Sequence, residues 1–236
     1  MMQPLLISLF ALGLTTQDPS TGAAGGAVAE EIPYKKVDPE KTIGMNMPGI
    51  EVIDLEGKSV DLSQFSEKTM ILEFTLPSCR FAQRLYIQKR VQPMIQRLAR
   101  QEILWFSVDS SFFAHPERWQ NWAKKYTLKH QFMLDNEGRL AEALGVRVSP
   151  TYIIVHKGKI IYHGSLDDDI WGQDLDRTVL LDQALKAGLA GETIEKPYEK
   201  PYGMAIRTRR VEEIRRKEFE EARKKALGDF DKPKGQ

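Results

Sequence analysis

The residue best suited to chemistry is Cys79, the only cysteine among 236 residues. A single thiol excludes an intramolecular disulfide, a cysteine-only metal cluster and a dithiol site within the chain. The pattern of residues 79–100 predicts a helix broken near Pro93, so Cys79 would open it. Free backbone N–H groups and the positive end of the helix dipole favour a thiolate there, and Arg80 adds positive charge. Such a thiolate can attack a disulfide or a peroxide, but it needs an outside thiol for its recovery.

A second candidate is Glu73, six residues before Cys79 in the mostly apolar run 69–75. A short apolar run is typical of a buried strand, and an unpaired carboxylate there is costly. The position therefore favours a functional role for Glu73. The alternative is an acid at a strand end that reaches solvent or pairs with a lysine.

The elements that must position these side chains alternate between strand and helix patterns. Strands are predicted at residues 50–55, 59–62, 69–75, 103–108, 131–134, 151–156 and 159–163, and helices at 79–100, from 115 onward, and 175–189. The last two strands flank a Lys157-Gly158 turn and form a hairpin. This alternation indicates an α/β sheet to which the hairpin adds antiparallel strands.

Charge and hydropathy divide the chain into three parts. The net charge of +1 gives no general case for nucleic-acid binding. Residues 5–14 are apolar but too few to span a bilayer, and Ala27-Val28-Ala29 offers a cleavage site. We therefore expect residues 1–29 to be a signal peptide and linker, and the protein to be exported to the periplasm or beyond the cell. A buried N-terminal helix fits the Gly/Ala-rich stretch 21–29 poorly.

The C-terminal part, residues 195–236, has an excess of basic side chains. Residues 210–227 have a helical pattern dense in Glu, Lys and Arg, with one narrow apolar stripe. A solvated helix is one interpretation, and docking on a protein partner or an anionic surface is the other.

Several segments resemble one family in their order and spacing. They are Leu72-Glu73-Phe74-Thr75 with Cys79-Arg80-Phe81, residues 105–111, Val148-Ser149-Pro150 before the hairpin, and Lys200-Pro201-Tyr202-Gly203. Together they resemble the thioredoxin-like superfamily, in its redoxin (alkyl hydroperoxide reductase/thiol-specific antioxidant-like) branch, over about residues 44–206.

The resemblance implies a thioredoxin-like α/β fold, a central mixed sheet flanked by helices, for which we assign residues 30–194. It implies that Glu73 relays protons to the thiol. It also implies that Pro150 is cis and holds the backbone of Ser149 against the thiol as a substrate platform. An antioxidant role in cell redox homeostasis, with no cofactor and no metal, would follow.

Departures from the family pattern restrict the mechanism. Ala82 stands where a C-x-x-C site has its second cysteine, and Met204 follows Gly203 where many redoxins continue with cysteine. Leu76 and Leu72 replace the threonine and proline that precede a peroxiredoxin cysteine. Dithiol exchange is therefore ruled out, and a typical peroxiredoxin site is unsupported.

Two functions remain open. The first is a monothiol oxidoreductase that reduces peroxides or disulfides through Cys79, with an external thiol or a thioredoxin-type reductant as its partner. The second is a redox-inactive binding or scaffold protein in which Cys79 is a small buried residue. Copper handling by soft ligands at Met45, Met47, Met204 and Cys79 is a weaker idea, because no His/Cys spacing supports a site.

Overall fold

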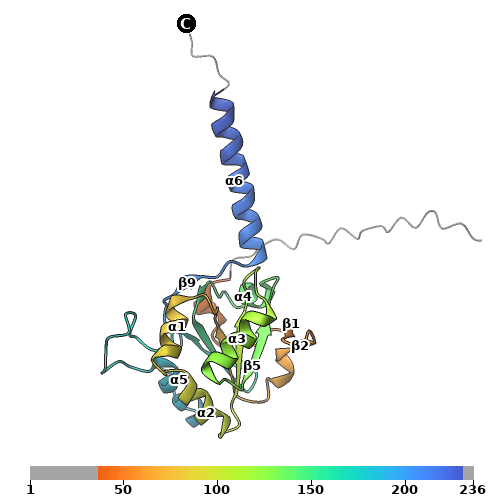
Figure 1. Ribbon diagram of the computed structural model, residues 1–236. Coiled ribbons are helices and arrows are strands. Elements are labelled where there is room, and N and C mark those ends of the chain that lie inside the picture. The colour runs from red at the N-terminus through yellow and green to blue at the C-terminus, as the bar shows by residue number, and fades with distance from the viewer. Residues whose placement is uncertain (1–36, 231–236) are drawn as a thin grey trace, which may run out of the picture. The chain divides into compact units, whose positions relative to one another are not determined.

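The computed structural model describes residues 37–230, drawn in colour in Figure 1. The predicted signal peptide and linker lie outside the described residues. None of the helices in the part that the structure describes is long and apolar enough to cross a membrane.

A seven-stranded mixed sheet forms the centre of the fold, with the strand order β2-β1-β5-β4-β3-β7-β8. Strands β3, β4 and β5 are parallel neighbours, whereas β7 runs antiparallel to β3 and β8 antiparallel to β7. The strands are β1 (Glu51–Asp54), β2 (Ser59–Asp61), β3 (Met70–Phe74), β4 (Leu104–Asp109), β5 (Gln131–Leu134), β7 (Thr151–His156) and β8 (Lys159–Gly164). The predicted α/β sheet with an antiparallel hairpin at its end is confirmed.

Helices flank this sheet (Figure 1). They are α1 (Arg80–Ile87), α2 (Gln92–Ala99), α3 (Pro116–Tyr126), α4 (Arg139–Ala143), α5 (Leu180–Ala190) and α6 (Arg209–Phe230), with 3-10 turns at Pro39–Thr42 and Leu62–Phe65. Pro93 lies in the first turn of α2, so the helix pattern 79–100 is two helices, as predicted. A separate two-stranded sheet joins β6 (Val148–Ser149) to β9 (Met204–Ala205).

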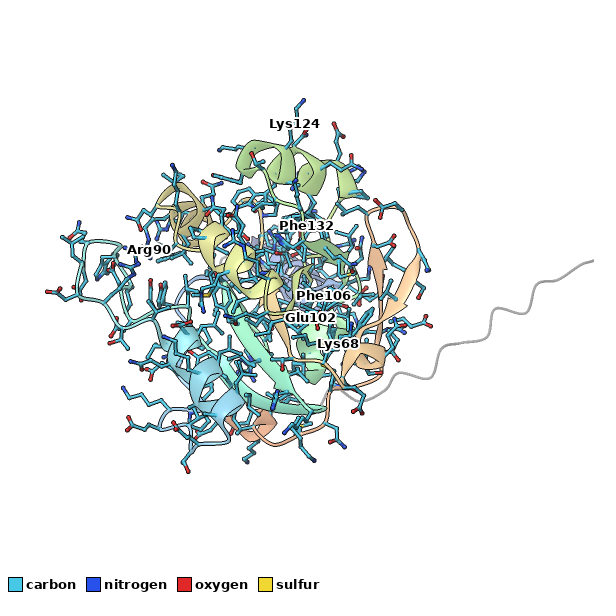
Figure 2. The ribbon with its side chains drawn as sticks, turned by 90° about the horizontal axis from the view of Figure 1, so that it is seen from below. Lys68, Arg90, Glu102, Phe106, Lys124 and Phe132 are labelled. Carbon is cyan, nitrogen blue, oxygen red and sulfur yellow. The ribbon has the colours of Figure 1, made fainter. Side chains whose placement is uncertain are left out.

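Alternating side chains divide the interior into two cores, one on each face of the sheet. On β3, Ile71 packs with α1, α2, α3 and α5, whereas Leu72 and Phe74 pack with α4 and the 3-10 turn at Leu62. Figure 2 shows Phe106 and Phe132 inside the fold and Lys124 pointing away from it. The aromatic stripe of α3 belongs to the first core, where Trp119 and Trp122 are buried.

The fifth helix begins later than its sequence pattern predicts, at Leu180 and not near residue 175. The backbone N–H groups of Asp176 and Thr178, inside the predicted range, are bonded instead to the carboxylates of Asp174 and Asp168. A side-chain acceptor competes here with the helical hydrogen bonds, so residues 165–179 form a loop.

The chain remains packed beyond residue 194. Tyr198 forms a bridge to His163, β9 pairs with β6, and the side chains of Ile206 and Thr208 are buried. The predicted charged helix is present as α6, and its side chains are largely exposed as far as residue 227. The assigned tail therefore starts with a segment that contacts the domain before it.

Candidate thiol site

Cys79 is the N-cap residue of α1, as the sequence predicts. Its backbone is extended (φ −74°, ψ 116°), and its carbonyl oxygen accepts the N–H of Gln83 at 2.8 Å. Its side chain makes no cap bond; the Sγ–H donates instead to the carbonyl oxygen of Ser149 at 2.9 Å. The thiol is fully buried.

Ser149 holds the loop that precedes the thiol as well as the thiol itself. Its Oγ accepts the N–H of Leu76 at 3.0 Å, while its carbonyl oxygen faces Cys79. The peptide bond between Ser149 and Pro150 is cis. The structure therefore brings together Cys79, Ser149 and Pro150 in the arrangement that the resemblance implies.

Arg80 lies beside the thiol in sequence but points to solvent. Its guanidinium group is 5.2 Å from the ring centre of Phe81, and that of Arg84 is 5.7 Å from the same ring. No hydrogen bond joins Arg80 to Cys79 in the described structure. Any effect of Arg80 on the thiol would be that of a nearby exposed charge.

Glu73 is fully buried in β3 and is held by four donors. Its Oε2 accepts from Tyr86 Oη at 2.8 Å, Trp105 Nε1 at 3.0 Å and Ser107 Oγ at 2.9 Å, and its Oε1 accepts from Tyr152 Oη at 3.3 Å. Burial raises the pKa of Glu73 above its ordinary value, and the four hydrogen bonds act in the opposite direction.

Glu73 and Cys79 share no hydrogen bond in the described structure. Glu73 projects into the core on one face of the sheet, with Tyr86 and Trp105, whereas Cys79 packs in the core on the other. The proton relay that the resemblance implies is therefore not a direct contact.

The hydrogen-bonded chain continues from Glu73 to His130. Ser107 Oγ lies 2.8 Å from His130 Nε2, and burial lowers the pKa of His130 to about 3, so the imidazole is neutral at ordinary pH. With Ser107 donating its hydroxyl proton to Glu73, the imidazole tautomer that carries its proton on Nε2 completes the chain by donating to Ser107.

The sequence did not point to the partners of Glu73. Tyr152 and Ser107 are its direct neighbours across the sheet, and Tyr86 lies near the end of α1. Strand register in the observed order β4-β3-β7 is the signal that places two of them beside Glu73.

The two positions where the family pattern places a second cysteine lie close to the thiol. Ala82 is buried in α1, in the same core as Cys79. Met204 belongs to β9 and is the register partner of Ser149. Both positions are thus next to the site, and neither supplies a thiol.

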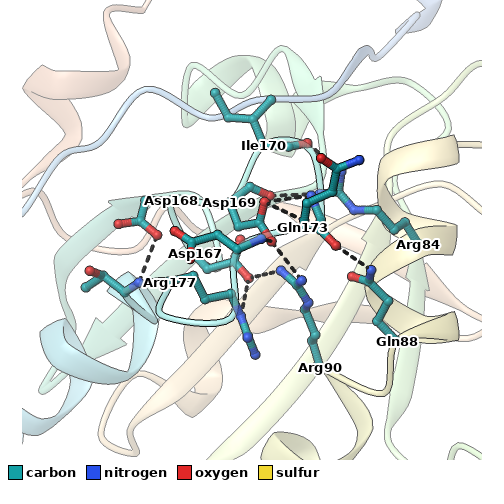
Figure 3. Close-up of polar contacts among 12 residues, drawn as sticks. Arg84, Gln88, Arg90, Asp167, Asp168, Asp169, Ile170, Gln173 and Arg177 are labelled. Carbon is teal, nitrogen blue, oxygen red and sulfur yellow. Dashed lines mark hydrogen bonds and ion pairs between the residues drawn. The ribbon is translucent and has the colours of Figure 1, made fainter.

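A loop beside α1 is held by buried ion pairs (Figure 3). Arg90 donates to Asp167 and to Asp169, each at 2.8 Å, and Arg177 also donates to Asp167. Arg84, on α1, donates to the backbone carbonyl oxygens of Asp169 and Ile170. The loop is therefore fixed to the helix that begins at the thiol.

A cavity of about 460 Å³ lies beside the loop that precedes the thiol. It is lined by Pro77, Ser78, Asp109, Phe113, Arg118 and Asn121. Among the described residues, no group of His, Cys, Asp and Glu side chains is arranged to hold a metal ion.

The family is decided by comparison with known sequences. The model of the AhpC/TSA family matches residues 43–163. The chain belongs to the AhpC/TSA family. Two curated relatives named thiol-disulfide oxidoreductase ResA, from Bacillus cereus and Bacillus thuringiensis subsp. konkukian, are each 28% identical over 130 residues. Each match covers 54% of this chain and 72% of the relative.

Solved structures agree on the fold. A hypothetical protein from Sinorhizobium meliloti 1021 superposes with a TM-score of 0.63 at 21% identity, covering 71% of this chain and 94% of that one. An uncharacterized conserved protein from Geobacillus kaustophilus gives a TM-score of 0.63 at 18% identity, covering 70% and 91%. The fold of this redoxin is thioredoxin-like, as predicted.

Proposed function

We propose that this redoxin is a monothiol oxidoreductase in which Cys79 reduces a peroxide or a disulfide and an external thiol completes the cycle. The observation that carries the proposal is the placement of the thiol at the start of α1, with Sγ against the carbonyl oxygen of Ser149. Membership of the AhpC/TSA family and relatives named as thiol-disulfide oxidoreductases support it.

The peroxide reaction balances with one thiol in the chain. The Cys79 thiolate sulfur attacks one oxygen, the O–O bond breaks, and the other oxygen leaves as an alcohol or water after taking a proton. The sulfenic acid then condenses with an external thiol and releases water, which gives a mixed disulfide. A second external thiol attacks that disulfide, restores the Cys79 thiol and leaves as the external disulfide.

The disulfide reaction uses the same site and the same recovery step. The thiolate attacks one sulfur of the substrate disulfide and the other sulfur leaves as a thiol. No second thiol in this chain can release the mixed product. An external thiol or a thioredoxin-type reductant therefore completes both reactions.

Other residues have supporting parts in the proposal. Arg80 adds positive charge at the start of α1, Ser149 and Pro150 form the platform beside the sulfur, and Glu73 holds a proton beneath α1. The protein acts outside the cytoplasm after its signal peptide directs export, and serves there as an antioxidant.

The complete burial of Cys79 favours a second candidate, a redox-inactive binding or scaffold protein. In that protein the thiol would be a packing residue, and α6 would contact the partner. Thiol turnover distinguishes the two candidates.

The test is peroxide consumption by the purified chain with an added thiol reductant. We expect turnover by the wild type, loss of at least about 100-fold in Cys79→Ser, because the serine hydroxyl is a far weaker nucleophile, and no loss in Ser78→Ala. Ser78 is the exposed neighbour of Cys79, so its replacement controls for disturbance of the loop. Equal rates in Cys79→Ser and the wild type would leave the scaffold as the better account.

A further inference from the structure

We propose that residues 202–205 of this chain occupy the edge along which an extended polypeptide would reach Cys79, so that the thiol reacts with small peroxides and small disulfides in preference to polypeptide disulfides. The inference rests on the proposed function and names its substrate class. We call residues 202–205 the C-terminal strap.

The strap already forms the strand pairing that a bound polypeptide would need. Met204 is the register partner of Ser149 and Ala205 that of Val148, in an antiparallel pair. The N–H of Ile206 extends the pairing by donating to the carbonyl oxygen of Arg147 at 2.8 Å. An extended peptide recognises a protein by adding a strand to a free edge, and this edge is occupied.

The contact between the strap and the thiol platform leaves no room for a side chain. A Cβ atom at Gly203 would lie 2.0 Å from the carbonyl oxygen of Ser149, the oxygen that accepts the bond from Cys79 Sγ. Only glycine fits there, because real Cβ atoms do not approach other atoms so closely. The strap backbone therefore packs directly on the group that holds the sulfur.

Contacts on the upstream side fix the strap across α1. Tyr202 Oη donates to Asp167 at 2.5 Å, and the Tyr202 ring centre lies 6.0 Å from that of Phe81 and 5.8 Å from the guanidinium carbon of Arg84. Asp167 is itself held by Arg90, so the loop beside α1 anchors the strap.

Contacts on the downstream side close the other end. Ile206 is buried in the core that contains Cys79, and Thr208 Oγ1 donates to Glu142 at 3.1 Å. The carbonyl oxygen of Arg207 accepts the N–H of Phe112 at 2.8 Å. The strap is thus anchored at both ends.

This arrangement separates substrates by size. A polypeptide disulfide needs the Ser149 edge, and it gains that edge only if β9 leaves β6 and the strap gives up its anchors. A hydroperoxide or a small disulfide needs no strand pairing. Because Cys79 is fully buried, such a molecule needs only an opening wide enough for one oxygen or sulfur atom to reach Sγ. The low-molecular-mass thiol that recovers the enzyme meets the same condition.

The experiment uses two probes with one leaving group on the full chain. One is a cysteine-containing peptide carried as its mixed disulfide with thionitrobenzoate, and the other is mercaptoethanol carried the same way. Attack by the Cys79 thiolate on the probe's own sulfur releases one thionitrobenzoate, which is followed by absorbance, without any need for turnover. The quantity compared is the ratio of the peptide rate to the mercaptoethanol rate.

In Gly203→Val the added side chain must displace the strap, and we expect this ratio to rise by at least about 10-fold, equivalent to about 1.4 kcal/mol. In Tyr202→Phe only the hydroxyl bound to Asp167 is lost, and we expect a smaller rise; this variant keeps the test valid if Gly203→Val does not fold. Gly57→Ala is the glycine control: the φ of +86° strains an alanine there, but its Cβ would meet no atom within 4 Å, so the strap is untouched and the ratio stays at the wild-type value.

Amide exchange at Ile206 reports whether the strap has been released. An unchanged ratio with Ile206 exposed to exchange overturns the inference, as does a wild-type chain that takes the peptide probe as fast as the small one. A raised ratio in Gly203→Val, together with no peroxide turnover by the wild type, supports the inference about the strap and contradicts the proposed oxidoreductase. The failure of one proposal is therefore distinguishable from the failure of the other.

Discussion

The carboxyl group of Glu73 is buried among four donors, and its pKa gives a test at the scale of one residue. Burial raises that pKa above the ordinary 4.5, so the folded chain holds the proton where the unfolded chain has released it. As pH rises from about 4.5 through the raised folded pKa, the free energy of unfolding therefore falls on account of Glu73.

Glu73→Gln removes this titration and retains hydrogen-bonding groups. We expect the variant to gain stability relative to the wild type as pH rises from mildly acidic to neutral, measured as the difference in urea unfolding free energy. Glu73→Leu leaves the Tyr86 and Trp105 donors unpaired, and we expect it to lose on the order of 3 kcal/mol at acidic pH. Parallel pH profiles of the wild type and Glu73→Gln would contradict the assignment of the raised pKa.

At this scale the sequence predicted the positions of the thiol and of Ser149 in the fold, because a helix start and a family pattern are local in the chain. It did not predict the partners of Glu73, because Ser107 and Tyr152 reach it only through strand register. Local patterns also could not show that Cys79 and Glu73 lie in different cores.

At the scale of one element, the geometry of α1 determines which position could carry a second cysteine in disulfide range of Cys79. Residues three apart in a helix lie on neighbouring positions of one face, and their Cα atoms are about 5 Å apart, within the range of a disulfide. Ala82 has this relation to Cys79 and is buried beside it. We therefore expect Ala82→Cys to form an intramolecular disulfide with Cys79 on mild oxidation.

Thiol titration before and after oxidation measures that outcome. The reduced variant should show two thiols and the oxidised one none. Ile87→Cys is the control: it is exposed at the last turn of α1 and should keep its thiol free of Cys79. Two free thiols in oxidised Ala82→Cys would show that the start of α1 does not have this geometry.

Elements with strong periodicity were predictable, including the hairpin and the helix pair around Pro93. The late start of α5 was not, because the carboxylates of Asp174 and Asp168 bind the backbone N–H groups of Asp176 and Thr178, which the sequence pattern assigns to the helix. Two-residue strands such as β6 and β9 carry no periodic signal, although their pairing covers the thiol platform.

At the scale of the whole molecule, Arg90, just after α1, binds Asp167 in the loop beside that helix (Figure 3). Asp167 in turn accepts the bond from Tyr202. The two carboxylate partners of Arg90 are almost fully buried. Although desolvation acts to raise the pKa of Asp169, the hydrogen bonds from Arg90 and the backbone hold it well below its ordinary value.

Arg90→Ala leaves these buried carboxylates without their main counter-charge, and we expect a loss on the order of 3 kcal/mol in unfolding free energy. Arg97→Ala is the matched control, because Arg97 pairs with Asp182 at a more exposed position and should cost about 1 kcal/mol or less. Equal losses in urea unfolding would mean that the Arg90 ion pairs do not hold the loop.

With one cysteine in the chain, a redox cycle through Cys79 needs another molecule to complete it. The most direct measurement is the intact mass of the chain. The chain is treated with one equivalent of hydrogen peroxide and then with an excess of a small thiol, and the reaction is quenched before the thiol has fully reduced the protein. We predict one mixed disulfide between that thiol and Cys79, and none in Cys79→Ser. An unmodified thiol at Cys79 with the peroxide still present would contradict the account.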